Sequence, residues 1–350
     1  EMRTRIFLRT AEFLWQEGHT VHATEDCAMK EVMTMLEVYR DLVENVLAIP
    51  VIPGEKSPGE RFPGAEKTFC IEAMMQDRKA LQAGTSHYLG QNFAKASGIR
   101  FLDSDGETKF AHTTSWGAST RLIGGLIMTH ADDDGMRVPP RVAPKHVIIL
   151  PVIRSDSDRD AILSSCNALA KELSEQLFFG EKVRVQVDAR DLPGGDKSWQ
   201  WIKKGAPLRI EIGPKDIASN SCVLFRRDKG VKDKAFIPRS EIAGKVIECL
   251  TDMQAGMFAQ AKQNLLSNIT TDIKTFAELK AYFTPKNEKQ PEIHGGFVRA
   301  KWCGDAATEE IIRELGVTIR CLPLDQSGTS GKCVITGKDA TIDAIFAKSY

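Results

Sequence analysis

The sequence predicts an α+β protein built from more than one domain. Residues 67–75 and 79–89 are apolar, strand-like segments on either side of a short turn. Residues 146–225 alternate strand patterns with helix patterns, which indicates a mostly parallel sheet with helices on both faces. A polar stretch at 283–292 then precedes a small C-terminal module. The 350 residues suffice for two or three domains that each bury a core.

The composition narrows the functional classes. Charged residues make up 27% and hydrophobic residues 42% of the chain, as is usual for globular proteins, and the long apolar run of a membrane span is absent. The net charge is zero, so any contact with nucleic acid must come from local patches. The eight cysteines are scattered singly and nothing resembles a signal peptide, which predicts a reducing, cytoplasmic location.

Residues 7–22 (FLRTAEFLWQEGHTVH) carry the densest polar and aromatic pattern. With a period of two, one face of a predicted strand carries Phe7, Arg9, Ala11, Phe13, Trp15, Glu17 and His19. An arginine binds phosphate through its planar fork, and a phenylalanine can stack on a base. A tryptophan beside a glutamate can hold a small cationic amine. The alternative is an ordinary half-buried strand with some exposed charge.

Further along, helix and strand patterns follow in a clear order. Residues 24–48 predict a helix that Thr24 caps and that Pro50 and Pro53 end. Residues 54–64 are rich in glycine, proline and charge and predict a loop. Residues 115–121 predict a strand that turns into a helix ending near residue 130.

Three segments carry a family resemblance. RTAEFLWQEGHT (residues 9–20) resembles the second half of motif 2 in class II aminoacyl-tRNA synthetases, and specifically in prolyl-tRNA synthetases of the archaeal and eukaryotic kind. LQAGTSHYLGQNF (81–93) agrees, and TSWGASTRLIGGLIMTH (114–130) looks like motif 3. The resemblance implies part of an antiparallel class II catalytic core at residues 1–143. It also implies ATP-dependent activation of L-proline and its transfer to the 3′ end of tRNA(Pro).

The resemblance also implies roles for individual residues. Arg9 and Arg121 would act on the phosphates as the catalytic pair, with Mg²⁺ as counter-ion. The residues expected to bind ATP are Glu1, Arg9, Thr10, Phe13, Gln82, Thr85, Ser119, Thr120 and Arg121. Those expected to bind proline are Trp15, Glu17, His19 and His87. Two alternatives remain: a lone strand histidine is often a core residue, and Arg121 could merely form a salt bridge.

Residues 144–250 resemble the anticodon-binding domain of several class II synthetases, most specifically in LRIEIGPKD (208–216). Stacking and edge hydrogen bonds would read single-stranded bases there. The candidates are Trp199, Trp201, Lys203, Lys204, Glu211, Lys215, Arg226 and Arg227. The alternative for the paired cations is a solvated charged face. Residues 251–285 predict a helical connection, with helices at 242–266 and near 275–282.

The last part, 286–350, resembles the extra C-terminal domain of this synthetase type. Cys303 and Cys333 match two of its zinc ligands, whereas Thr308 and Thr336 occupy the other two positions. Structural zinc needs four nitrogen or sulfur ligands, so we predict that zinc is absent. By resemblance, Tyr350 reaches back toward the active site. A frayed tail is the alternative.

Three further expectations concern the enzyme as a whole. Fewer than a hundred residues separate Glu17 from Thr113, which leaves no room for the editing insertion of bacterial-type enzymes. Motif 1 and the start of motif 2 are missing, so we expect an N-terminally truncated chain that is inactive alone, and a homodimer in the intact protein. Two alternatives stay open: another class II specificity, or a non-catalytic tRNA-binding relative.

Overall fold

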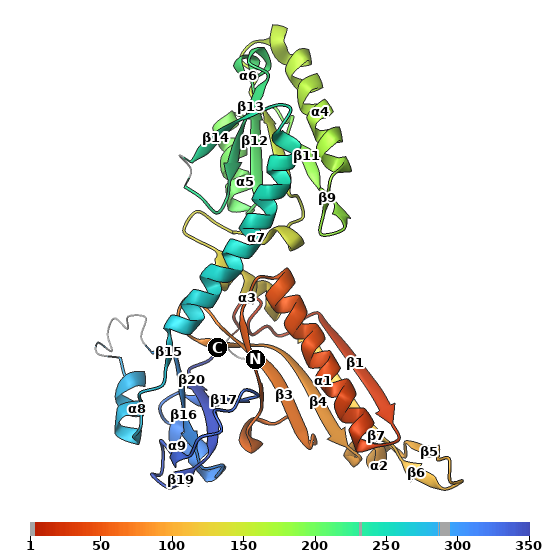
Figure 1. Ribbon diagram of the computed structural model, residues 1–350, viewed down its shortest axis with the longest axis vertical. Coiled ribbons are helices and arrows are strands. Elements are labelled where there is room, and N and C mark those ends of the chain that lie inside the picture. The colour runs from red at the N-terminus through yellow and green to blue at the C-terminus, as the bar shows by residue number, and fades with distance from the viewer. Residues whose placement is uncertain (1–3, 231–232, 286, 288–294) are drawn as a thin grey trace. The chain divides into compact units, whose positions relative to one another are not determined.

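The computed structural model describes residues 4–230, 233–285, 287 and 295–350. The chain forms two compact units, which Figure 1 shows by residue colour. The first combines residues 1–45, 49–129 and 262–350, and the second combines 46–48 with 130–261. The second unit is therefore inserted in the sequence of the first. In the described residues, no helix is both long and apolar enough to cross a membrane.

A nine-stranded sheet organises the described part of the first unit. In sheet order its strands are β1 (Trp15–His22), β7 (His112–Ser119), β4 (Ala80–Gly90), β3 (Lys67–Met74), β2 (Val51–Glu55), β17 (Thr318–Pro323), β20 (Ile342–Ala347), β16 (Phe297–Trp302) and β15 (Ile269–Thr270). Every neighbouring pair from β1 to β16 is antiparallel, and β15 pairs with β16 in parallel. The C-terminal strands thus continue the sheet of the N-terminal part.

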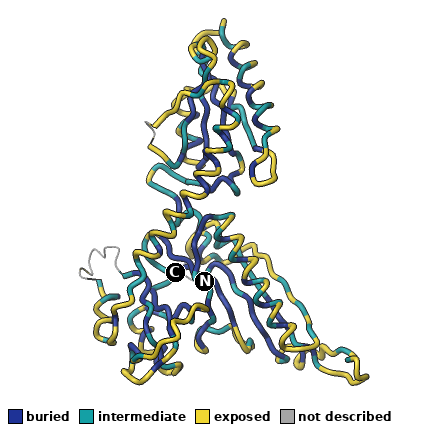
Figure 2. Tube along the Cα trace, in the orientation of Figure 1, coloured by how far each residue is buried: buried dark blue, intermediate teal, exposed yellow. Residues whose placement is uncertain are grey.

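Helix α1 (Glu25–Asp41) covers one face of this sheet (Figure 1). The Thr24 side chain accepts a hydrogen bond from the Cys27 backbone N–H, and acidic residues in the first turn favour the positive end of the helix dipole. One stripe of the helix is buried, namely Ala28, Val32, Leu36 and Tyr39, and the helix lies against β4 and β7. Buried residues are dark blue in Figure 2. A π-helical turn at Leu42–Val46 follows, so the predicted helix at 24–48 is confirmed except in its last turn.

Two predictions for the N-terminal part are wrong. The strand predicted for residues 7–22 begins only at Trp15, because residues 5–9 form a tight turn with hydrogen bonds in both directions between Arg5 and Arg9. Phe7 has a φ of 61° in this turn, which no strand allows. Strand β2 extends to Gly54 and Glu55, the first two residues of the loop predicted at 54–64. Pro53 lacks an N–H, but its carbonyl still accepts a hydrogen bond from Leu324 N at 3.0 Å.

Shorter elements complete the first unit. They are the 3₁₀ turn η2 (Pro58–Glu60), the helices α2 (Asn92–Ser97), α3 (Arg121–His130), α8 (Phe276–Phe283) and α9 (Ala307–Arg313), and the strands β5 (Arg100–Leu102), β6 (Thr108–Phe110), β18 (Gly331–Lys332) and β19 (Asp339–Ala340). The 3₁₀ turn η3 (Pro140–Val142) belongs to the second unit. Helix α8 begins with a capping box between Thr275 and Glu278. The predicted strands at 67–75 and 79–89 and the helix near 275–282 are confirmed. The polar linker predicted at 283–292 lies largely outside the described residues.

A shared core joins the N-terminal and C-terminal parts of the first unit. Cys70, Met74 and Ala80 pack with residues of the C-terminal strands, among them Phe297 and Ile345. A buried ion cluster reinforces this junction. Lys56 Nζ contacts Glu72 Oε1 at 2.8 Å, and the Arg320 guanidinium donates to both Glu72 oxygens at 3.0–3.2 Å. The three side chains are 2%, 0% and 7% exposed, so their charges depend on one another.

The second unit is a five-stranded sheet among the described residues, in the order β11 (Val185–Val187), β8 (Val147–Pro151), β12 (Leu208–Ile212), β13 (Ser221–Arg226) and β14 (Lys234–Pro238). Only β11, β8 and β12 are mutually parallel, so the prediction of a mostly parallel sheet is wrong for the β12–β14 half. The edge strand β14 was not predicted, since its exposed residues show no apolar alternation.

Helices lie on both faces of this sheet, as predicted. They are α4 (Arg159–Glu175), which follows the 3₁₀ turn η4 (Asp156–Asp158), α5 (Gly194–Lys203), α6 (Pro214–Ala218) and the long α7 (Ile242–Ser267); a small hairpin pairs β9 (Leu177–Phe178) with β10 (Glu181–Lys182). Val147 and Ile149 pack with α4 and α7, whereas Ile148 and Leu150 pack with Trp201 of α5. This alternation along β8 is the period of a strand buried on both faces.

Candidate active site

A cavity of about 440 Å³ opens in the first unit, beside strands β1, β4 and β7. Its wall is completed by the loop that follows β2. The lining residues are Phe13, Trp15, Glu17, Lys56, Glu60, Arg61, Phe62, Pro63, Thr68, Gln82, Ala83, Gly84, Thr85, His87, Ser115, Trp116, Gly117, Ala118, Ser119 and Arg121. Aromatic rings, a carboxylate and a guanidinium therefore face one space, which suits a ligand with a flat base, an amine and phosphates.

The register of the three strands explains how residues distant in sequence meet. Glu17 pairs with Gly117, and Gly117 pairs on its other side with Thr85. Antiparallel pairing places directly opposite side chains on the same face of the sheet, roughly 4.5–5.5 Å apart. Gly117 has no side chain and leaves space between the other two. Trp15 pairs with Ser119 one step further along.

The structure gathers most of the residues predicted to bind ATP or proline, but not all. Those that line the cavity are Phe13, Trp15, Glu17, Gln82, Thr85, His87, Ser119 and Arg121. Those outside its lining are Arg9, Thr10, His19 and Thr120. His19 nevertheless lies 3.3 Å from Glu17, between Nε2 and Oε1. Glu1, the remaining predicted ATP contact, lies outside the described residues.

His87 is held by its neighbours in a buried position. Only 8% of the residue is exposed, and its Nδ1 lies 3.0 Å from the Thr68 hydroxyl oxygen. The ring of Phe62 packs against it with centroids 4.8 Å apart. Burial lowers the pKa of His87 from 6.5 to about 4, so the imidazole is neutral at physiological pH.

This burial leads to a testable result for the pH dependence of His87. Because its folded pKa is depressed, the stability gained from the neutral ring is complete above pH 6.5 and is lost as the pH falls toward about 4. In an NMR titration, the ring resonances assigned through a His87→Gln variant should stay constant from pH 8 to about 5.5. A midpoint near 6.5 would contradict the burial described.

Arg121 stands at the start of α3, where the chain leaves β7. Burial, and after it the charge of Arg9, lowers the pKa of the Arg121 guanidinium. Its Nε donates to the Leu8 carbonyl at 3.2 Å, which fixes the direction of the fork. A second guanidinium close enough to act on Arg121 makes this side of the site attractive to a polyanion.

Tyr350 lies against the turn that carries Arg9. Arg9 Nη2 donates to the main-chain oxygen of Tyr350 at 2.8 Å, and Lys79 Nζ stands 5.2 Å from the centre of the tyrosine ring. The Ala80 N–H donates to the carbonyl of Lys348 at 2.8 Å, which ties the last residues to β4. Tyr350 is thus packed beside the nine-stranded sheet and is not a frayed tail, and its reach toward the active site stays a prediction.

Sequence reasoning missed the part of the cavity wall made by residues 56–63. This segment was assigned to a loop without a role, yet Lys56, Glu60, Arg61, Phe62 and Pro63 all line the cavity. A phenylalanine and an arginine within a glycine- and proline-rich loop were the available signal. The partners that hold the loop lie about 250 residues later and give no local sign.

The expected zinc positions carry hydrogen-bonded hydroxyl groups in part. Thr308 Oγ1 accepts from Trp302 Nε1 at 2.7 Å and donates to the Asp305 carbonyl at 2.6 Å. Thr336 Oγ1 lies 3.8 Å from Cys303 Sγ. Within the described ranges, no three His, Cys, Asp or Glu side chains are grouped as metal ligands. The absence of zinc stays a prediction.

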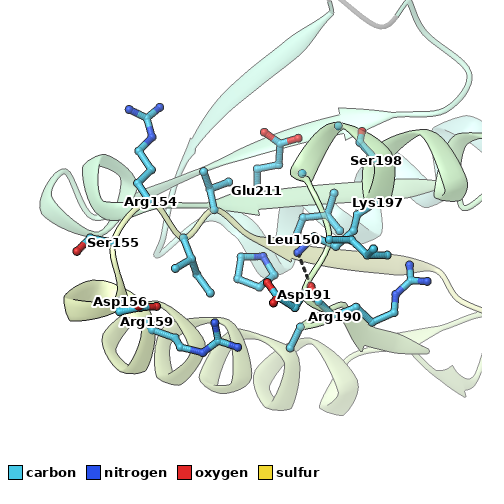
Figure 3. A pocket seen from close by; sticks show the side chains of 17 residues that line it. Leu150, Arg154, Ser155, Asp156, Arg159, Arg190, Asp191, Lys197, Ser198 and Glu211 are labelled. Carbon is cyan, nitrogen blue, oxygen red and sulfur yellow. Dashed lines mark hydrogen bonds between the residues drawn. The ribbon is translucent and has the colours of Figure 1, made fainter.

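A second cavity, of about 720 Å³, lies in the other unit at the carboxyl ends of β8, β11 and β12 (Figure 3). Parallel strands place such ends at one edge, where ligands of α/β sheets usually bind. The charged residues that line it are Arg154, Asp156, Arg159, Arg190, Asp191, Lys197 and Glu211. Burial raises the pKa of the Glu211 carboxyl, so neutral Glu211 is favoured more than at the surface.

Of the candidate anticodon residues, only Glu211 lines this cavity. Trp201 is a core residue, 9% exposed, whose Nε1 donates to Asp188 at 2.8 Å. Arg226 pairs with Asp228 and Asp252, and Arg227 pairs with Asp132. Trp199 is 42% exposed, with Lys203 Nζ 5.4 Å from its ring centre. The arginines of the loops after β8 and β11 were missed because no motif marks them.

Comparison with known families places each part of the chain. Residues 1–130 match the family described as tRNA synthetase class II core domain (G, H, P, S and T). Residues 146–248 match the anticodon binding domain, and residues 287–350 match the family described as prolyl-tRNA synthetase, C-terminal. The first match contains all of the residues that line the 440 Å³ cavity.

Similar proteins span the whole chain. The proline–tRNA ligase of Protochlamydia amoebophila is 58% identical over 350 residues, which is 100% of this chain and 69% of that protein. The proline–tRNA ligase of Bdellovibrio bacteriovorus is 52% identical with the same coverage, and proline–tRNA ligase 2 of Anaeromyxobacter dehalogenans is 53% identical over 355 residues. Such identity over all matched domains, with the cavity residues inside them, shows that the chain belongs to the proline–tRNA ligase family of class II aminoacyl-tRNA synthetases.

Proposed function

We propose that this chain catalyses the ATP-dependent activation of L-proline and the transfer of the prolyl group to the 3′ end of tRNA(Pro). The observation that carries the proposal is the 440 Å³ cavity of the class II core, in which Trp15, Glu17 and His87 face the same space as Arg121. The relatives over the full chain support the same reaction.

In the first step, a carboxylate oxygen of proline attacks the α-phosphorus of ATP. A new P–O bond forms, the bond to the β-phosphate bridging oxygen breaks, and pyrophosphate leaves. In the second step, a terminal hydroxyl of the tRNA attacks the acyl carbon and AMP leaves. The protein contributes mainly by positioning the reactants and neutralising charge.

We assign the phosphates to Arg9 and Arg121, since the charge of Arg9 acts on the Arg121 guanidinium and two such cations suit a polyanion. Phe13 stacks on the adenine, and the other nucleotide contacts are Thr10, Gln82, Thr85, Ser119 and Thr120, with Glu1 on the adenine amino edge. Glu17 accepts from the charged secondary amine of proline, and Trp15, His19 and His87 shape its pocket. A neutral His87 fits here, since it adds no positive charge beside the ammonium group.

Mg²⁺ would enter with ATP and neutralise phosphate charge. This ion usually keeps several waters and binds through phosphates and one or two carboxylates, so a dedicated protein cage is not needed. Glu17 and Glu60 are the carboxylates that line the cavity. We propose no bound zinc.

We also propose the archaeal/eukaryotic-like type without an editing insertion. Between Glu17 and Thr113 the structure describes every residue, and α1, β2, β3, β4 and short elements fill the segment. The division into a catalytic part (1–143), an anticodon-binding part (144–250), a helical connection (251–285) and a C-terminal module (286–350) belongs to the same proposal. So do a homodimeric intact protein and a cytoplasmic location.

The direct test is ATP–pyrophosphate exchange by the full-length protein with proline, threonine, glycine, histidine and alanine. We expect exchange with proline and at least 10²-fold less exchange with threonine, glycine and histidine, because polar or differently shaped side chains leave groups unpaired. Alanine should be rejected less strongly, since ring contacts alone contribute roughly 1–3 kcal/mol. Exchange with another amino acid only, or binding of tRNA without exchange, would overturn the assignment.

The 720 Å³ cavity is proposed to receive the anticodon, and Arg159 tests this. Arg159→Ala should raise the KM for tRNA roughly tenfold and lower the salt dependence of tRNA binding by about one charge. Proline-dependent exchange without tRNA should not change, because the cavity takes no part in adenylate formation. Lys245→Ala, an exposed cation of α7 that pairs with Glu248, is the control. Equal effects of the two variants would contradict the assignment.

A further inference from the structure

We propose that Glu309, in the C-terminal module, is a positioning residue for the proline pocket. It holds the loop at residues 57–63, and this loop forms one wall of the cavity. The inference rests on the proposed function. It gives the C-terminal module a part in amino-acid binding, although no residue of that module lines the cavity.

The carboxylate of Glu309 is bonded to the loop through both of its oxygens. Ser57 Oγ donates to Oε2 at 2.9 Å, and the Gly59 backbone N–H donates to Oε1 at 3.2 Å. Glu309 is 3% exposed and Ser57 is fully buried, so water has little access to the bond between them, whereas Gly59 is exposed and its bond is only partly buried. Hydrogen bonds to a buried carboxylate are stronger than neutral ones, and leaving such a group unpaired is costly.

The loop approaches Glu309 so closely that a side chain at Gly59 would require the carboxylate to move. A Cβ added at Gly59 would lie 2.6 Å from Glu309 Oε2, well inside van der Waals contact. The same approach engages Ser57, whose hydroxyl would otherwise be free to cap the turn at Pro58–Glu60. The structure gives it no capping bond there. Both features indicate that the loop is shaped to this carboxylate.

From this anchor the chain runs directly to the pocket. The Phe62 N–H donates to Thr68 Oγ1 at 3.1 Å, and the same oxygen lies 3.0 Å from His87 Nδ1. The Phe62 ring packs on His87. Only two residues separate Gly59 from Phe62, so a shift at the anchor displaces the Phe62–His87 wall. Glu309 touches neither ATP nor proline and acts through the loop.

A second tie to the same helix is weaker. Arg313 Nη2 lies 3.2 Å from Glu60 Oε1 and 3.4 Å from the Gly59 carbonyl oxygen, but its side chain is 40% exposed. Solvent screens such a pair, so its contribution is small. Glu309 is therefore the residue whose loss should release the loop.

The test uses Glu309→Gln in the full-length protein, with Glu310→Gln as the matched control. Glu310 is the next residue of the same helix, and its carboxylate pairs with Arg313. A glutamine at 309 presents an NH₂ group to one of the two loop donors. We expect the KM for proline in ATP–pyrophosphate exchange to rise roughly tenfold, as the loss of one charge-assisted hydrogen bond predicts. The kcat and the KM for ATP should change less than about threefold.

A Ser57 pair checks the route of the effect. Ser57→Ala should reproduce part of the rise in the KM for proline. Ser57→Thr, which keeps the hydroxyl, should leave this KM near the wild-type value. The double variant Ser57→Ala/Glu309→Gln should be no worse than Glu309→Gln alone, because both remove one interaction. Strictly additive effects, or equal rises in the KM for proline and the KM for ATP, would mean a general structural role and overturn the proposal.

Hydrogen–deuterium exchange separates this inference from the proposed function. In Glu309→Gln the amides of residues 57–66 should exchange faster, and in Glu310→Gln they should not. Unchanged protection in Glu309→Gln refutes the anchor, whichever amino acid the enzyme activates. Faster hydrogen–deuterium exchange in residues 57–66 together with an unchanged KM for proline refutes the positioning role. Absence of proline-dependent exchange in the wild type would instead refute the proposed function.

Discussion

Arg121→Ala is expected to lower kcat for proline-dependent ATP–pyrophosphate exchange by about 10²–10³-fold, the usual cost of removing one preorganised donor to developing charge. The guanidinium lies in the cavity wall and is aimed by its bond to the Leu8 carbonyl. Because the cavity is partly shielded from water, the charge acts on phosphate more strongly than it would at the surface. Arg121→Lys should recover little, since a point charge cannot reproduce the fork.

The control for this prediction is Arg40→Ala. Arg40 lies on α1, pairs with Glu37 and is 42% exposed in its side chain, so its loss should leave exchange within a factor of about two. Thermal unfolding of both variants shows whether either has lost structure. If Arg121→Ala keeps full exchange activity while folded, the assignment of the phosphates to this side of the cavity is wrong.

Glu72→Ala is expected to destabilise the first unit by about 3–5 kcal/mol, because it leaves Lys56 and Arg320 as unpaired buried cations. Burial acts to raise the pKa of the Glu72 carboxyl, but the charges of Arg320 and Lys56 outweigh it and the pKa is lowered. A depressed carboxyl pKa stabilises the fold above the ordinary value of 4.5 and loses this effect as the pH falls below it. Urea unfolding of the wild type and the variant at pH 7 and pH 4 measures the loss of stability and its dependence on pH.

A triple variant, Lys56→Met/Glu72→Leu/Arg320→Met, tests the explanation. It removes all three charges together, so it should cost less than Glu72→Ala, as replacing a whole buried ion cluster by apolar groups often does. Between pH 7 and pH 4, the triple variant should also lose less stability than the wild type does. A triple variant less stable than Glu72→Ala would show that packing around the cluster, not charge, dominates.

Local patterns in the sequence were enough for the elements that position the cavity. Thr24 with its acidic neighbours marked the start of α1, and the apolar runs around the turn at 76–78 marked β3 and β4. WQEGH lies in β1 and AGTSH in β4, on either side of β7, and the antiparallel register of both with β7 decides which side chains meet. The segments at 9–20, 81–93 and 114–130 therefore contain much of the cavity lining.

The parts that escaped prediction depend on distant contacts. Strand β2 contains a proline and a glycine and exists because β3 and β17 flank it on either side. Residues 56–63 looked like an ordinary loop, since Glu309 and Arg320, which hold that region, come some 250 residues later. The turn at residues 5–9 requires Phe7 to adopt a positive φ, which alternation of side chains cannot reveal.

The pairing of β2 with β17 also has a consequence for the order of events during synthesis. Glu55 cannot pair until Leu322 has been synthesised, and residues 130–261, nearly all of the second unit, emerge from the ribosome between them. At about 5–20 residues per second, these 267 residues (322 minus 55) take roughly 13–53 s to translate. Throughout that interval the hairpin strands present an unpaired hydrogen-bonding edge, which is a template for aggregation. The inserted unit can fold first, so the nascent chain is expected to depend on chaperones mainly for its N-terminal sheet.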